Sequence, residues 1–172
     1  MESGKRPEPT RLVRSIWLSI LAIAGCSFAG RTANPRSTFI TPAEATAWLT
    51  VGESSASFEI PIIVRNASDA TIYTEWCSVN AQRFIDGTWQ TVFRASCLAL
   101  SDPTPIPPGH SLTVTLHAFG RTELSAAPKL DPRMTPGLYR AVVDLFTVDG
   151  TGHRIALPER ERESSTFTVA RK

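Results

Sequence analysis

The sequence has few of the residues from which metal and nucleic-acid sites are built. Its 172 residues include three cysteines and three histidines, too few for a Cys/His-rich zinc module. The 18 Lys and Arg residues are nearly balanced by 16 Asp and Glu residues, without the clustered basic excess of nucleic-acid-binding proteins. We therefore expect no cofactor, no metal site and no nucleic-acid partner.

A membrane-spanning helix is also missing from the N-terminal region. The apolar run Ser15–Gly25 has 11 residues, and at 1.5 Å per residue a helix of that length covers about half of a bilayer core. Four basic residues precede the run, namely Lys5, Arg6, Arg11 and Arg14. This arrangement is typical of a secretory signal peptide. A short buried helix of the domain is the alternative.

The apolar run ends in Ile23-Ala24-Gly25-Cys26. These four residues resemble the lipobox of bacterial lipoproteins, in which an aliphatic and two small residues precede a cysteine, although the family more often has leucine where Ile23 stands. The resemblance implies that a signal peptide, residues 1–25, is removed and that Cys26 is acylated with fatty acids such as palmitate. Several acyl chains hold a protein durably on a membrane. Ser27 follows instead of aspartate, which in this family favours the outer membrane, facing the periplasm.

Cleavage before Cys26 would change the net charge of the chain, and acylation of Cys26 would change the number of cysteines that can form a disulfide. The removed segment carries four basic and two acidic residues, so 14 of each sign remain and the mature chain has no net charge. Cys77 and Cys97 are then the two remaining cysteines, an even number in an oxidising compartment. A disulfide between them would close a loop of about 20 residues and stabilise the fold by roughly 3 kcal/mol. Two free buried thiols are the alternative.

The mature chain divides into a tether and one domain. Residues 26–44 have no period and contain Asn34-Pro35 and Thr41-Pro42, which predicts a flexible tether. Residues 45–172 contain short runs in which apolar and polar residues alternate, as in half-buried strands. The clearest runs are Ser57–Val64, Ser111–His117, Tyr139–Leu145 and Thr166–Val169, with weaker ones at Ala45–Val51 and Ala70–Val79.

Turn residues separate these runs. Asp86-Gly87 and Asp149-Gly150 each lie between two strand-like segments, and both dipeptides suit hairpin turns with positive φ. Pro61 falls on the outward phase of its run, which predicts a strand near a sheet edge or a bulge. Seven to eight strands without a helical period predict an all-β, antiparallel β-sandwich.

Several stretches of the mature chain resemble the immunoglobulin-like domains of exported bacterial proteins. The matching stretches are Ile60–Asn66, Ile106–Gly109 before Leu112–Val114, Pro136–Arg140, and Ser165–Val169. The resemblance implies an immunoglobulin-like sandwich over about residues 45–170. The Cys, Trp, distant Cys spacing of antibody domains is absent, and these motifs indicate a fold and no activity.

Candidate catalytic residues do not form a set. Gly109-His110-Ser111-Leu112-Thr113 is similar to the nucleophile elbow of esterases, but Thr113 replaces the final glycine and an alternating run follows where a helix is needed. The other two histidines, His117 and His153, have no ligand-like spacing. The alternating charges of Glu159–Glu163 indicate a solvated loop or an edge segment. We therefore expect no enzyme.

Aromatic residues concentrate around the Asp86-Gly87 turn. Trp76, Phe84 and Trp89 are candidates for a contact surface if they lie on the outer face, and the core is the alternative place for them. Our first hypothesis is a non-enzymatic, lipid-anchored cell-envelope protein whose immunoglobulin-like module binds an unidentified envelope protein. The rival hypotheses are an exported proteinase inhibitor that inserts a proline-rich loop, Ser101–Gly109 or Ala126–Gly137, and a secreted hydrolase built on Ser111.

Overall fold

The computed structural model describes residues 36–53, 55–95, 102–121 and 136–172. In these ranges the protein is all-β, with ten strands and one turn of 3-10 helix, so the predicted fold class is confirmed at this level. The elements are β1 (Thr38–Pro42), β2 (Thr46–Val51), β3 (Ser55–Asn66), β4 (Ile72–Ile85), β5 (Thr88–Phe93), β6 (Thr104–Ile106), β7 (Ser111–Arg121), β8 (Gly137–Val148), β9 (Arg154–Ala156), η1 (Glu159–Glu161) and β10 (Phe167–Arg171).

The ten strands form one mixed sheet. Its main order is β1-β3-β2-β10-β8-β4-β5, while β7 pairs with β3, β6 with β4 and β9 with β8. Strand β2 joins the two halves because it pairs with β3 through Thr50 and Val51 and with β10 through Thr46–Leu49. The β2–β10 pair is parallel.

Two details of the predicted architecture are therefore wrong. The sheet is not purely antiparallel, and it has more strands than the seven to eight expected. Strands β2 and β10 come from opposite ends of the domain, so no short hairpin forces them to run in opposite directions. The two short strands β6 and β9 have only three residues each, too few for an alternating pattern to be recognised in the sequence.

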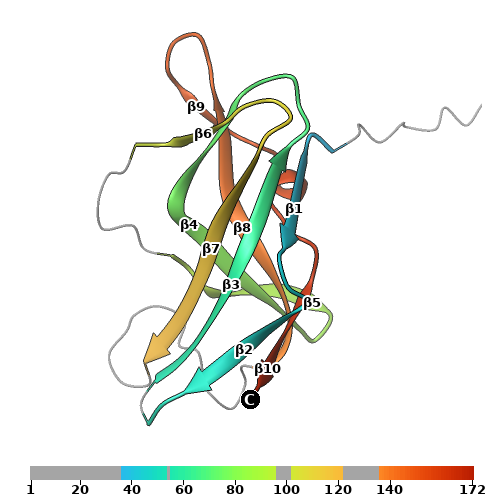
Figure 1. The fold of residues 1–172 in the computed structure, drawn as a ribbon, viewed down its shortest axis with the longest axis vertical. Helices are drawn as coiled ribbons and strands as arrows, with labels where there is room; N and C mark the ends of the chain where they lie inside the picture. The colour runs from blue at the N-terminus through green and yellow to red at the C-terminus, as the bar shows by residue number, and fades with distance from the viewer. Residues whose placement is uncertain (1–35, 54, 96–101, 122–135) are drawn as a thin grey trace, which may run out of the picture. The chain divides into compact units, whose positions relative to one another are not determined.

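The two halves of the sheet face each other across a common core. Figure 1 shows β3 and β7 in front of β4 and β8. Phe58 on β3 meets Tyr139 on β8 and Phe167 on β10, with ring centroids 5.4 and 6.3 Å apart. Alternate residues of β3 are at most 3% exposed, and these are Ala56, Phe58, Ile60, Ile62 and Val64. Burial of each large apolar side chain contributes about 1.5–3 kcal/mol.

The predicted tether is wrong for residues 38–42, which form β1. This strand pairs with β3 from Thr38 to Pro42, and it buries Thr38 and Ile40 while Phe39 between them is exposed. The alternation is only a few residues long and ends at a proline, so the sequence alone does not separate it from a linker. The free edge of β3 supplies the partner that makes it a strand.

The charged run at 159–163 is solvated only at its start, where Glu159 and Arg160 are exposed. Glu161 is 7% exposed, and its carboxylate accepts a hydrogen bond from the hydroxyl of Ser37. The backbone carbonyl of Glu161 accepts another from the hydroxyl of Thr38. Helix η1 therefore holds the start of β1, an interaction between residues more than 120 positions apart.

Pro61 lies inside the sheet, so its predicted position near an edge is wrong. Strand β3 pairs with β1 on one side and with β7 on the other. The carbonyl of Pro61 accepts from the amide of Ala43 just after β1 ends. The N and O of one strand residue point to the same side of the strand. The nitrogen of Pro61 therefore faces the break between β1 and β2, so the absence of its N–H removes no hydrogen bond between paired strands.

Asn66 ties together the two turns at one end of the domain. It is fully buried, and its side-chain amide donates to the carbonyls of Ala70 and Ile106, both at 2.8 Å. Its side-chain oxygen accepts from the amide and hydroxyl of Ser68. These bonds join the β3–β4 turn to β6, so Asn66 ends its strand as a structural corner.

The two predicted turns differ in their outcome. Asp86-Gly87 is a two-residue hairpin between β4 and β5, with φ of 48° and 81°, as a turn of this type requires. The turn after β8 is longer than predicted, because Val148 pairs with Arg154. There the side chain of Asp149 accepts from Thr151 and from the amide of His153, and Gly152, not Gly150, has positive φ.

Replacement of Gly87 by alanine tests the hairpin. A Cβ at Gly87 meets no atom within 4 Å, so the expected loss of about 1 kcal/mol in unfolding free energy comes from backbone strain alone. Gly150 also has open space around it, but its φ lies outside the left-handed range. Chemical denaturation of Gly150→Ala should show unchanged or slightly higher stability. Equal losses in both variants would contradict the assigned turn.

The buried hydroxyl of Tyr139 makes stability depend on pH. Burial raises the pKa of this hydroxyl to about 12, although the positive charge of Arg83 lowers it in part. The unfolded chain ionises the residue near pH 10, so its contribution is intact below pH 10 and is lost as the pH rises toward 12. We expect the difference in unfolding free energy between wild type and Tyr139→Phe to fall by roughly 3 kcal/mol over this interval. A pH-independent difference would contradict the prediction.

Candidate functional site

The predicted contact surface lies partly on the outer face of the sheet. Phe84 and Trp89 are cross-strand neighbours beside the β4–β5 turn, with ring centroids 5.1 Å apart. Phe84 is 43% exposed and Trp89 is half-buried. The side chain of the third candidate, Trp76, lies outside the described set, so its assignment stays a prediction.

A charged network centred on β8, across β4 from β5, contacts Trp89. The guanidinium of Arg140 on β8 lies over the indole ring, 4.7 Å from its centroid. The same group donates to the side-chain oxygen of Gln82 and binds the carboxylate of Glu163, both at 2.7 Å. The side chains of Arg140 and Glu163 are 14% and 17% exposed. The network therefore presents the aromatic pair in a fixed position without net charge.

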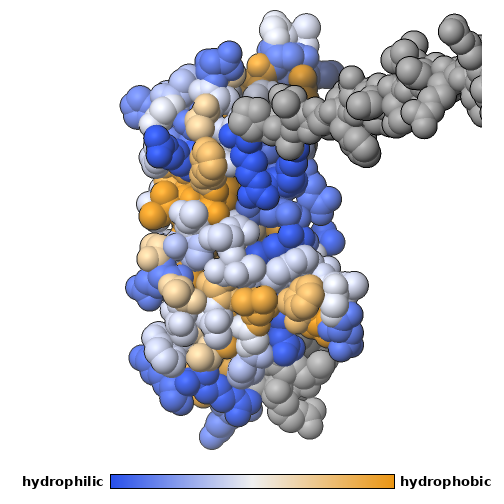
Figure 2. Space-filling model, turned by 90° about the vertical axis from the view of Figure 1, so that its right-hand side faces the viewer, coloured by the Kyte–Doolittle hydropathy of each residue, from blue (hydrophilic) through white to orange (hydrophobic). Residues whose placement is uncertain are grey.

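Two further apolar side chains point outward from this half of the sheet. Leu138 on β8 is 42% exposed beside the buried Tyr139, and Trp48 on β2 is 49% exposed between two buried neighbours. Because Arg83 pairs with Tyr139, the register places Phe84 next to Leu138. We name Trp48, Phe84, Trp89 and Leu138 the outer aromatic face. Figure 2 shows that, on the side it draws, apolar areas are surrounded by hydrophilic ones.

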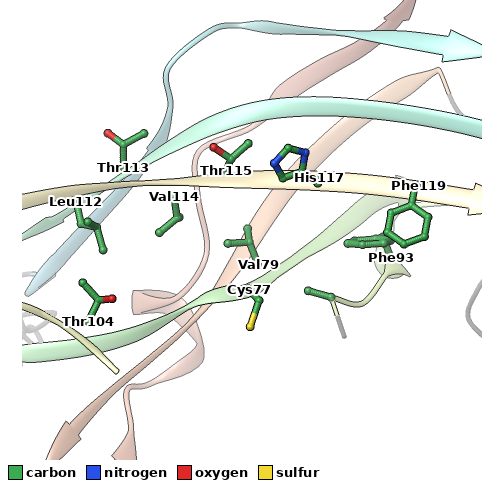
Figure 3. A pocket seen from close by; sticks show the side chains of 11 residues that line it. Cys77, Val79, Phe93, Thr104, Leu112, Thr113, Val114, Thr115, His117 and Phe119 are labelled. Atoms are coloured by element: carbon green, nitrogen blue, oxygen red, sulfur yellow. The ribbon is translucent and has the colours of Figure 1, made fainter. Parts of the chain in front are cut away.

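A pocket of about 440 Å³ opens between β7 and the β4–β5 half of the sheet. Figure 3 shows Val79, Leu112 and Val114 in the space between the strands, with the Cys77 sulfur nearby. At one end of the pocket the ring centroids of Phe93 and Phe119 are 5.7 Å apart, and Phe119 is 65% exposed. The described lining is mainly apolar, with His117 and a few hydroxyl groups as its polar members, so it favours an apolar occupant.

A second hollow of about 340 Å³ lies where β2 leaves β3 to join β10. Glu44, Glu59 and His117 are among its lining residues. His117 pairs with Glu59 at 3.3 Å, and both side chains are more than 60% exposed. The described residues contain no group of three or more His, Cys, Asp or Glu side chains that could hold a metal ion. This pair is therefore an exposed surface interaction.

Ser111 does not form a nucleophile elbow. It is the first residue of β7 and pairs with Arg65 on β3, and a strand follows it in place of the helix that the elbow requires. The preceding His110 places its ring Nδ1 3.0 Å from the carbonyl of Pro108. His153 belongs to the turn after β8. The three histidines are thus spread over separate exposed positions.

The first proline-rich loop proposed for proteinase inhibition is partly built into the sheet. Thr104–Ile106 pairs with Ile72–Thr74 as β6, and the next turn is bonded to Asn66 through the amide of Gly109. Of the second loop, only residues 136 and 137 lie within the described ranges. The described part of the first loop is therefore held by strand pairing and hydrogen bonds, and proteinase inhibition stays a prediction.

The processing and disulfide predictions fall largely outside the described residues. Residues 1–25 and Cys26 are not among them, and neither is Cys97. Cys77 lies on β4 and contributes to the lining of the pocket in Figure 3. The lipid attachment and the Cys77–Cys97 disulfide thus stay predictions. No helix in the described ranges is long and apolar enough to cross a bilayer.

Sequence patterns missed the residues that position the aromatic pair. Arg140 and Glu163 are 23 positions apart, and Gln82 comes from a third segment of the chain. The outward phase of Arg140 in its alternating run was the one available signal, and it indicated only exposure. Pairing of β4 with β8 brings Arg140 beside Gln82.

Comparisons with known proteins give no family. No family model and no curated protein matches the chain. Among solved structures, the structural-genomics target SoR45 aligns with 78% of this chain and 87% of its own, at 12% identity and a TM-score of 0.45. The putative ApaA protein from Bordetella pertussis aligns with 78% and 91%, at 13% identity and a TM-score of 0.39. Likenesses this low do not support a functional assignment.

Removal of Glu163 tests the charged network. In Glu163→Ala the guanidinium of Arg140 keeps little exposure and loses its ion partner, so we expect a loss of about 1–3 kcal/mol in unfolding free energy. The Glu75–Arg154 pair is the matched control, because the Arg154 side chain is 52% exposed. Glu75→Ala should cost at most about 1 kcal/mol. Equal costs in denaturant titrations would show that burial does not distinguish the pairs.

Proposed function

We propose that this protein is a non-enzymatic, lipid-anchored component of the bacterial cell envelope whose domain binds another envelope protein. The observation that carries the binding role is the outer aromatic face, where Phe84 packs against Trp89 and the guanidinium of Arg140 lies over the Trp89 ring. Tryptophan and arginine are enriched among the few residues that supply most of the binding energy of protein interfaces. Because Arg140 already holds the Trp89 ring, less side-chain entropy is lost when a partner binds.

The strand order supports an immunoglobulin-like domain as the finer description of the fold. The neighbours β1-β3-β7 correspond to strands A, B and E, and β10-β8-β4-β5 correspond to G, F, C and C′. Tyr139 stands near the start of β8, where such domains often have a structural tyrosine on strand F. One difference is that β6, which precedes β7, pairs with β4 instead of β7.

The proposed anchor rests on the N-terminal sequence. A basic segment, an apolar run of 11 residues and the box ending in Cys26 occur in the order that lipoprotein export requires. Acylation of Cys26 would place the domain outside the cytosol, where the remaining cysteines can pair. The neutral mature chain fits a protein held by its lipids and not by surface charge.

Mass spectrometry of the purified full-length product tests the anchor. We expect the mature chain to begin at Cys26 with added mass from fatty acyl groups, and to fractionate with membranes. Cys26→Ser should remove the acyl mass and most of the membrane association, since one residue carries the attachment. An uncleaved, unacylated wild-type chain would overturn this part of the proposal.

Site-specific crosslinking in cells tests the binding face. The variant Phe84→Ala/Trp89→Ala should lose a crosslinked adduct that wild type forms from a photoreactive residue at Gln90, an exposed neighbour on β5. Phe39→Ala is the control, because Phe39 is 49% exposed on β1, away from the outer aromatic face. Circular dichroism checks that both variants remain folded. An adduct that persists in the double variant would contradict a role for this face.

A further inference from the structure

The chain enters the domain beside two turns that are bonded to each other. The amide of Ala67 donates to the carbonyl of Ser37 at 2.8 Å. Asn66 exchanges backbone hydrogen bonds of 2.9 Å with Gly109 and His110. We name Ser37, the β3–β4 turn (67–71) and the β6–β7 turn (107–110) the entry end. In Figure 1 these turns lie together in the upper part of the domain, where β1 begins.

The Phe84–Trp89 pair lies at the other end of β4. This strand leaves the entry end at Ile72 and runs for 14 residues to the β4–β5 turn, but a bulge between Thr74 and Val79 shortens its path. Tyr73 to Arg83 pairs with only Phe146 to Tyr139 on β8, so the strand spans about 30 Å. Figure 1 shows β4 descending from the turns at the top to the hairpin with β5 in the lower half of the view. The predicted contact surface and the chain entry thus lie at opposite ends of β4.

The chain between Cys26 and Ser37 limits how far the entry end can move from an anchor. These residues are 11 positions apart, and even a fully extended chain of that length spans at most about 40 Å. For the β4–β5 hairpin to reach the lipid surface, this segment would have to extend over about 30 Å alongside the domain, which is most of its maximum length. Such extension gives up most of the conformational entropy of the segment.

The charges at the entry end are compatible with lipid headgroups. Arg36 just before β1 and Arg65 at the end of β3 are exposed, while the acids at this end are the exposed Asp69 in the β3–β4 turn and Glu161, whose carboxylate accepts from Ser37. Cationic side chains near a membrane are attracted by anionic lipids. Because Asn66 bonds both turns together, this end meets a surface as one rigid unit.

We propose that the short reach from Cys26 holds the entry end against lipid headgroups and directs the Phe84–Trp89 hairpin away from the membrane. This inference rests on the proposed lipid anchor. It assigns the turns at 67–71 and 107–110 as the lipid-facing surface. A partner protein would then meet the outer aromatic face from the aqueous side, where the bilayer does not block access.

Paramagnetic broadening measured by NMR tests the orientation. The acylated full chain is placed in nanodiscs of phosphatidylethanolamine and phosphatidylglycerol, with and without a gadolinium-chelating lipid. We expect the amides of Ala67, Asp69 and His110 to lose several times more intensity than those of Gly87 and Thr88. Equal loss at the two ends, or greater loss at the hairpin, would overturn the proposal.

A longer chain segment provides the matched control. Insertion of about 20 Gly and Ser residues after Ser27 extends the reach beyond the length of the domain, so the contrast between the two ends should shrink. An unchanged contrast would overturn the argument from reach. Failure of the anchor gives a different result, because an unacylated chain stays off the nanodiscs and shows no broadening at either end. That result would remove the proposed function together with the inference.

Discussion

Burial of one face of β3 is the constraint on which the rest of the structure depends. Its alternate side chains from Ala56 to Val64 are almost fully buried, and Phe58 among them meets aromatic rings from β8 and β10. A slip of one residue would move this whole apolar set to the solvent face. The register of β1 and β7 follows from it, because both strands pair with β3 along most of their length.

Strand β2 changes its pairing partner along its length and so joins the two halves of the sheet around this core. One end of β2 belongs to the β3 half of the sheet and the other end to the β10 half. Trp48 therefore lies on the same outer side as Leu138, across β10. Arg140 contacts the Trp89 ring beside the hairpin, while Asn66 joins the turns at the opposite end of β4. A binding surface and a chain entry can thus be kept apart within one small domain.

The candidate site was only partly accessible to sequence reasoning. Phe84 and Trp89 were found because a hairpin turn of known type places them on facing strands. Arg140, Gln82 and Glu163 were missed because three separate segments meet only after β4 pairs with β8. The burial of Glu161, in a run predicted to be a solvated loop or an edge segment, was missed for the same reason, since its partners Ser37 and Thr38 lie more than 120 positions earlier. Local patterns contain no information about such distant contacts.

Alternation of apolar residues within single segments was enough to determine the all-β class and the strands around Phe58, Val114, Tyr139 and Phe167, because side-chain direction in a strand has a period of two. The Asp86-Gly87 turn was likewise determined locally, since few residues tolerate its backbone angles. Tertiary structure decided the parallel β2–β10 pair, the inclusion of β1 in the sheet and the interior position of Pro61. Each of these depends on which strand edge is free to pair, and that is settled only when distant parts of the chain meet.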